Sequence, residues 1–84
     1  MFSELTHTAD KVVGLKQVLK GAQAGELSCI YIAQDADADI RRRLLDAAHR
    51  SGTQHIMVPT RSQLGQVCGI KVPAACAGLV KKDN

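Results

Sequence analysis

The sequence predicts an α/β protein: a three-layer α/β/α sandwich around a mixed, mostly buried sheet of about four strands. Short runs of apolar and β-branched residues alternate along the chain with segments whose apolar residues recur at helical spacing, as in such a sandwich. Hydrophobic residues make up 45% of the chain and aromatic residues only 2%, so we expect an aliphatic core. Because 84 residues suffice for one core, we expect a single domain over residues 1–84.

The first third of the chain predicts a helix, a strand and a second helix. The sequence SELT, from Ser3, is a weak capping box that would begin a short helix. Residues 11–14 are expected to form a short strand. Apolar residues of the next helix share one face: Leu15, Val18, Leu19 and Ala22. We expect Gly21 to loosen this helix and Gly25 to end it.

The middle third predicts a strand and a long helix. Residues 28–33, with the sequence SCIYIA, favour a strand because they are rich in β-branched and aromatic side chains. Asp35 or Asp37 is expected to cap the helix that follows, and Gly52 to end it. The three arginines at 41–43 point in different directions on this helix, which indicates a solvated face. Its expected buried stripe consists of Ile40, Leu44, Leu45 and Ala48.

The last third predicts a strand, a short helix and a final strand. Residues 55–59 form a buried strand ended by proline. The sequence TRSQ at 60–63 is a capping box that opens a helix through Val67. A loop marked by glycine and proline then leads to a strand over residues 75–80.

Metal sites and enzyme sites have little support. The acidic run at 35–39 resembles a calcium loop, but Ile40 and Asp46 stand where that loop needs Gly and Glu. No Cys-x-x-Cys pair occurs, and the histidines show no metal-ligand spacing with the cysteines. Cys68 with a distant histidine is a formal nucleophile–base pair, yet a buried structural thiol explains it better. We therefore expect no catalysis, no metal and no cofactor.

The cysteine count and the N-terminus indicate the compartment. Cys29, Cys68 and Cys76 are an odd number in a chain whose first residues, MFSELTHTAD, lack the features of a signal peptide. We expect reduced, buried thiols in a cytoplasmic protein. No stretch of about 18 apolar residues occurs, so no membrane association is expected.

The start of the helix after Gly14 carries the clearest functional pattern. Gly14 has no side chain to cap the free N–H groups, and Lys16 and Lys20 place cations where a helix prefers anions. Gln17 lies beside them. Although a solvated face is the commoner explanation, free N–H groups, lysines and a glycine together favour a phosphate ligand.

Three blocks of the sequence resemble the ribosomal proteins of the L7Ae type, which bind kink-turn RNA. The blocks are GLKQVLKGAQAGEL, CIYIAQDADADI and HIMVPTRSQLGQVCGIKVPAACAGLV, in the family's order and with compatible spacing over roughly residues 9–80. The short length and the GLKQ block are most similar to the small bacterial members. The resemblance implies an RNA-binding α/β/α sandwich.

The resemblance also implies which residues contact RNA. In the family, the helix after the glycine reads kink-turn guanines in the major groove and touches phosphates; the matching residues are Gly14, Lys16, Gln17 and Lys20. Archaeal and eukaryotic members usually have Asn and Glu in place of Lys16 and Gln17, although Lys and Gln also bond to guanine acceptors. Asp37 matches an acidic residue that orients the site, and Arg61 a basic RNA contact.

The loop before the last strand is the second implied contact. In the family it packs apolar side chains on the RNA, and its counterpart here is Ile70, Lys71, Val72, Pro73 and Ala74. Lys71 replaces a more usual Glu. From the residues alone, this loop is equally well explained as a lid over the core.

The sequence therefore predicts a monomeric protein that binds structured RNA with a kink-turn or similar internal loop, with ribosomal RNA as a candidate. Two alternatives stay open. One is a module that binds a small phosphate-containing ligand at the same helix start. The other is a protein-interaction subunit without RNA contact.

Overall fold

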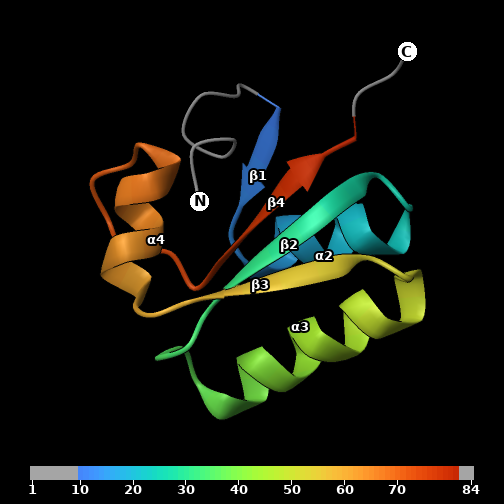
Figure 1. The fold of residues 1–84 in the computed structure, drawn as a ribbon, viewed down its shortest axis with the longest axis horizontal. Coiled ribbons are helices and arrows are strands. Elements are labelled where there is room, and N and C mark those ends of the chain that lie inside the picture. Colours follow the sequence, from blue (N-terminus) through green and yellow to red (C-terminus); the bar gives the residue numbers. More distant parts are fainter. Residues whose placement is uncertain (1–9, 82–84) are drawn as a thin grey trace.

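The computed structural model describes residues 10–81, which contain a four-stranded sheet and three helices (Figure 1). The helix expected near Ser3 lies outside the described residues. The elements follow the predicted alternation: β1 (Lys11–Val13), α2 (Leu15–Gln23), β2 (Leu27–Ala33), α3 (Ala38–Ser51), β3 (Gln54–Val58), α4 (Arg61–Cys68) and β4 (Cys76–Val80). None of these helices has the length and apolar character needed to cross a membrane.

The sheet is mixed, as predicted, with the strand order β1-β4-β2-β3. β4 runs antiparallel to both of its neighbours, whereas β2 and β3 are parallel. The strands β1, β2 and β3 therefore all run in one direction, opposite to β4. α2 and α3 each return the chain to the end of the sheet where the preceding strand began, whereas α4 stays at one end, because β4 starts at the end where β3 finishes.

Helices cover both faces of the sheet, which confirms the three-layer prediction. The side chains of β2 alternate between the two faces, as a strand requires: Ile30 and Ile32 pack with the core residues of α2 and α3, whereas Tyr31 packs with those of α4. The core between the sheet and helices α2 and α3 is mainly aliphatic and includes Val18 and Leu44. β2 is thus a central strand buried on both sides.

Two expectations about burial are wrong. β3 was expected to be buried, but it is an edge strand whose first residues, Gln54 and His55, are exposed and of which only Val58 is fully buried. Leu45 was expected in the buried stripe of α3, but it is 38% exposed, whereas Leu44 and Ala48 form the buried part of that stripe. Helical periodicity could not separate Leu45 from Leu44, because adjacent residues lie only about 100° apart.

Two glycines permit close packing inside the fold. A Cβ at Gly21 would lie 3.1 Å from the side chain of Leu27, so the absence of a side chain at Gly21 allows α2 to approach β2 closely. A Cβ at Gly65 would overlap the carbonyl oxygen of Val72. The loop before β4 consequently rests directly on the backbone of α4.

The three cysteines are free and buried, as expected from their apolar neighbours. Cys76 begins β4 and is fully buried. Burial is the larger effect and raises the pKa of the Cys76 thiol from its usual 9.0 to about 12, while the backbone N–H of Gly14 opposes that rise. Burial also raises the pKa of Cys68. Both thiols are therefore protonated at neutral pH and act as small apolar side chains.

We expect Gly65→Ala to destabilise the fold. The added methyl group must displace the Val72 backbone, and such overpacking costs about 1–3 kcal/mol, which exceeds the gain of about 1 kcal/mol in helix propensity. Urea unfolding measures the difference. The control is Gln66→Ala on the exposed side of the same helix, which should stay within about 0.5 kcal/mol of the parent. Equal stability of both variants would contradict the contact.

We also expect Cys76 to make the protein less stable at alkaline pH. Since the pKa of the thiol is raised on folding, the unfolded chain loses this proton at lower pH than the folded one. The contribution of Cys76 to the free energy of unfolding is thus full below the usual pKa of 9.0 and declines as pH rises toward about 12. Urea unfolding of the parent and of Cys76→Ala across this range should show a smaller decline in the variant. Parallel declines would contradict burial of the thiol.

Candidate nucleic-acid interface

The residues that the sequence singled out come together at one end of the sheet. Because β1, β2 and β3 run in one direction and β4 in the other, the loops after the first three strands lie at the same end as the loop before β4. On the left of Figure 1, the ends of β2 and β3 and the beginning of β4 converge beside α4. We call this end of the molecule the loop edge.

Backbone hydrogen bonds to residues 74–76 hold the loop edge together. The N–H of Ala74 donates to the carbonyl oxygen of Arg61 at the start of α4 (3.0 Å). The N–H of Ala33, at the end of β2, donates to the oxygen of Ala75 (2.9 Å). The N–H of Gly14 donates to the oxygen of Cys76 (3.1 Å). The segment before β4 thus fixes the starts of α2 and α4 relative to each other.

The start of α2 is uncapped, as predicted. Gly14 is the N-cap residue and offers no side-chain bond, while its φ of 105° is a conformation that L side chains rarely adopt. The first intrahelical hydrogen bond is donated by the N–H of Val18 to the oxygen of Gly14, so the amides of residues 15–17 have no acceptor within the helix. The first turn contains no acidic residue. Lys16, Gln17 and Lys20 are exposed. This end therefore presents free N–H groups, the positive end of a helix dipole and the ammonium group of Lys16, whereas Lys20, expected among the cations of the helix start, lies in the last turn of α2.

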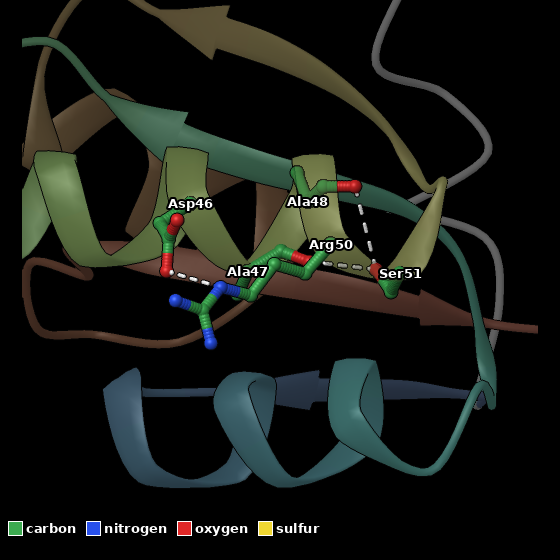
Figure 2. A network of polar contacts seen from close by, with 5 residues as sticks. All are labelled: Asp46, Ala47, Ala48, Arg50 and Ser51. Atoms are coloured by element: carbon green, nitrogen blue, oxygen red, sulfur yellow. Dashed lines mark hydrogen bonds and ion pairs between the residues drawn. The ribbon is translucent and has the colours of Figure 1, made fainter.

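Three of the five arginines in α3 and α4 are paired with carboxylates, but the lysines of α2 are not. Arg42 pairs with Asp39 (2.6 Å), Arg50 with Asp46 (3.0 Å; Figure 2), and Arg61 lies 3.6 Å from Asp35. Within residues 10–81, no carboxylate lies within ion-pair distance of Lys16, Lys20 or Lys71. Lys16, Lys20 and Lys71 therefore carry positive charge that no described carboxylate neutralises.

Asp35 has a role that the sequence did not reveal. It was expected, as an alternative to Asp37, to cap α3, but its carboxylate accepts from the N–H of Arg61 (2.7 Å) at the start of α4. Thr60 completes that start, since its hydroxyl oxygen accepts from the N–H of Gln63 (3.0 Å), as the TRSQ pattern predicts. No sequence signal links Asp35 to Arg61, because the two residues are 26 positions apart.

Asp37 occupies the N-cap position of α3 without capping it. Its side chain makes no hydrogen bond to the first turn of α3, so the capping prediction is right in position and wrong in mechanism. The carboxylate is exposed at the loop edge. Arg61, by contrast, is engaged with Asp35, although its side chain remains 54% exposed.

The loop at residues 70–73 has one side chain in the core and the others in solvent. Ile70 is half-buried and packs against the core cluster beneath α4, as the lid interpretation predicts. Val72 is 62% exposed, and Lys71 and Pro73 are also exposed. This loop and the outer face of α4 border a shallow hollow of about 340 Å³. Val72 is therefore the apolar side chain best placed to meet a ligand.

The described residues offer no arrangement suited to a metal. Within residues 10–81, no group of three or more His, Cys, Asp or Glu side chains is placed to hold an ion. The loop edge presents free backbone amides and exposed lysines, groups that favour anions, with exposed polar and apolar side chains around them.

Comparison with known proteins gives consistent matches along the chain. A profile of the family described as "Ribosomal protein L7Ae/L30e/S12e/Gadd45 family" matches residues 3–84. An RNA-binding protein of Caldanaerobacter subterraneus subsp. tengcongensis is 36% identical over 67 residues, which cover 80% of this chain and 82% of that protein. The RNA-binding protein YbxF of Geobacillus stearothermophilus is 30% identical over 70 residues, covering 83% and 85%.

A solved structure matches the fold as well. The 15.5kD RNA binding protein of Giardia lamblia superposes with a TM-score of 0.87 at 25% sequence identity. The match covers 98% of this chain and 69% of that one. The order and arrangement of the elements are therefore shared with an RNA-binding protein of known structure.

Proposed function

The chain belongs to the ribosomal protein L7Ae/L30e/S12e/Gadd45 family, and from this premise we propose that it binds structured RNA containing a kink-turn or similar internal loop. The bacterial relatives described above are named RNA-binding proteins, which supports a binding function and not an enzymatic one. We further propose that it works in the cytoplasm as a monomer, with ribosomal RNA among its candidate ligands.

The observation that carries this proposal is the uncapped, unneutralised start of α2. Lys16 and Lys20 are exposed and have no ion-pair partner among the described residues; Lys16 stands beside the free helix amides, and Lys20 follows one turn later on the same side of α2. RNA phosphates would supply what both groups lack, because their oxygens accept hydrogen bonds from the free amides and their charge neutralises the lysines. Gly14 adds no side chain that would block the approach of a backbone.

Gln17 is the proposed source of selectivity. Phosphate contacts position a protein without reading sequence, whereas hydrogen bonds to base edges discriminate. A regular A-form helix hides its major-groove edges in a deep, narrow groove, and a kink opens them. Gln17 is exposed in the first turn of α2, and its amide can bond to guanine acceptors there.

The loop at residues 70–73 is the proposed second contact. Val72 presents the apolar surface, and Lys71 replaces the family's more usual acidic residue with a cation that attracts phosphate. Asp37, exposed at the same edge, is proposed to orient the site, and Arg61 to contact RNA from its partly exposed position. Ile70 supports this loop by packing against the core.

In this proposal the protein stabilises the kinked RNA because it binds the kinked conformation more tightly than the unkinked one. A ligand shifts a conformational equilibrium only as far as its affinities for the two conformations differ. The loop edge is held by hydrogen bonds among its own segments, so its two contacts have a fixed separation that one RNA conformation fits better than others. No bond is made or broken in this mechanism.

The small-ligand alternative receives no specific support. It would be favoured by an enclosed pocket beside Gly14. The two hollows described in this structure lie between α2 and α3 and between α4 and the loop at 70–73, and neither is lined by Gly14, Lys16 or Gln17.

Gln17→Ala and Lys20→Ala should weaken RNA binding in different ways. Loss of a base-edge contact at Gln17 should cost about 1–3 kcal/mol on kink-turn RNA and almost nothing on a plain duplex. Loss of a phosphate contact at Lys20 should weaken binding to both RNAs and make the salt dependence shallower by about one unit. Fluorescence titrations across salt concentrations measure both effects.

Arg42→Ala is the control for these variants, because Arg42 is paired with Asp39 on the solvated side of α3. It should bind like the parent, with folding checked by circular dichroism. The proposal is wrong if Arg42→Ala loses binding while Gln17→Ala and Lys20→Ala retain it.

Val72→Ala and Ile70→Ala should separate contact from support. Val72 is mostly exposed, so its truncation should weaken RNA binding with little change in salt slope or in stability. Ile70 packs on the core, so its truncation should lower the free energy of unfolding by about 1–3 kcal/mol. RNA titration and urea unfolding of each variant test this division, which fails if Val72→Ala binds RNA like the parent.

A further inference from the structure

A groove between α2 and α3 lies next to the proposed RNA interface. It has a volume of about 430 Å³, and its walls include Leu19 and Gln23 from α2 and Arg43 and Arg50 from α3. Both helices begin at the loop edge, because α2 follows the end of β1 and α3 follows the end of β2, and these strands run in one direction. Arg43 and Leu19, the earliest wall residues of each helix, are therefore at the end of the groove nearest that edge.

The cations of α3 differ in whether a carboxylate already neutralises them. Arg50 is paired with Asp46 at 3.0 Å, on the side of α3 that faces α2 (Figure 2). Arg42 is paired with Asp39 at 2.6 Å. Arg43 is exposed, and no described residue pairs with it. Its guanidinium is thus available for a ligand, and its planar fork suits a phosphate group.

Arg43 continues the line of charge that begins at the start of α2. Lys16 and Lys20 are one turn apart, and Gln23, which follows Lys20 by three positions, forms the α2 wall of the groove. Arg43 stands on the opposite wall. Both helices begin at the loop edge, and Lys20 and Arg43 are each the sixth residue of their helix, so the two cations stand at similar heights along the groove and an RNA backbone that follows the lysines can reach Arg43.

We propose that Arg43 contacts the phosphate backbone of a stem that flanks the kink, so that the RNA interface crosses the groove from α2 to α3. This rests on the proposed function. A partner protein fits the groove less well, because Leu19 and Ala47 are already half-buried against the core and leave little apolar surface for a docked helix. The exposed, unneutralised group at this end of the groove is cationic, which matches a polyanion.

Adjacent arginines provide the matched test. Arg43→Ala should bind long-stemmed kink-turn RNA several-fold more weakly than the parent, with a salt dependence shallower by about one unit. Arg42→Ala removes the same charge one residue away and should change neither quantity. Arg43→Lys should restore most of the salt slope. The titrations are repeated with RNAs in which each flanking stem in turn is shortened to the pairs next to the kink, and one shortening should abolish the difference between Arg43→Ala and the parent.

Three results would overturn the inference. In the first, Arg43→Ala binds every RNA like the parent, which would leave the groove to another class of partner. In the second, Arg43→Ala loses no more RNA affinity than Arg42→Ala does. In the third, Arg43→Ala still binds more weakly than the parent whichever stem is shortened. Lys20→Ala is measured alongside. If Lys20→Ala binds weakly and Arg43→Ala does not, the proposed function stands and this extension fails. If neither variant changes binding, both proposals fail.

Discussion

The loop edge depends on the hydrogen bonding of three consecutive residues, Ala74–Cys76. The N–H of Ala74 donates to Arg61, and the carbonyl oxygens of Ala75 and Cys76 accept from Ala33 and Gly14. Arg61, Ala33 and Gly14 lie at or beside the loops that follow three different strands. In addition, Asp35 binds the N–H of Arg61 and so attaches the loop after β2 to the start of α4. Segments distant in sequence therefore form one surface with fixed spacing, as the proposed recognition of a kinked RNA requires.

The conformation of Gly14 explains why that surface is positive. The chain turns from β1 into α2 through a residue with φ of 105°, which excludes the Ser, Thr and Asp residues that usually cap a helix. The first amides of α2 are thereby left open, and Lys16 adds charge of the sign that the helix dipole disfavours. These features lower the intrinsic stability of α2, a cost that the proposed RNA phosphate would offset. The buried Cys76, bonded through its carbonyl to Gly14, anchors the same turn to β4.

The sequence predicted the order and type of the elements because each rests on local signals. The spacing of apolar residues, the TRSQ capping box and Gly52 after α3 all act within a few residues of one another, and the structure agrees with them. The free start of α2 was predictable for the same reason. The position of a strand at the sheet edge, by contrast, depends on strand order, so the exposure of β3 could not be read from its apolar residues.

The details that arrange the site depend on contacts across the sequence. Asp35 had a local explanation as a cap for α3, but Arg61 lies within reach only after folding. Gly65 showed no local reason to be glycine, and its reason is the carbonyl of Val72 in the loop it supports. The sequence also left Ile70 and Val72 alike, and only the structure separates the core residue from the exposed one.

Amide chemical shifts recorded during titration with kink-turn RNA test the central claim most directly, because they report on every described segment at once. If the loop edge is the RNA-binding surface, the largest changes fall on the amides of residues 15–17 and on the loop at 70–73. Gly25 and Gly52, which follow the far ends of α2 and α3, should change little. Largest changes at those glycines or along β3, with residues 15–17 unaffected, would contradict the claim.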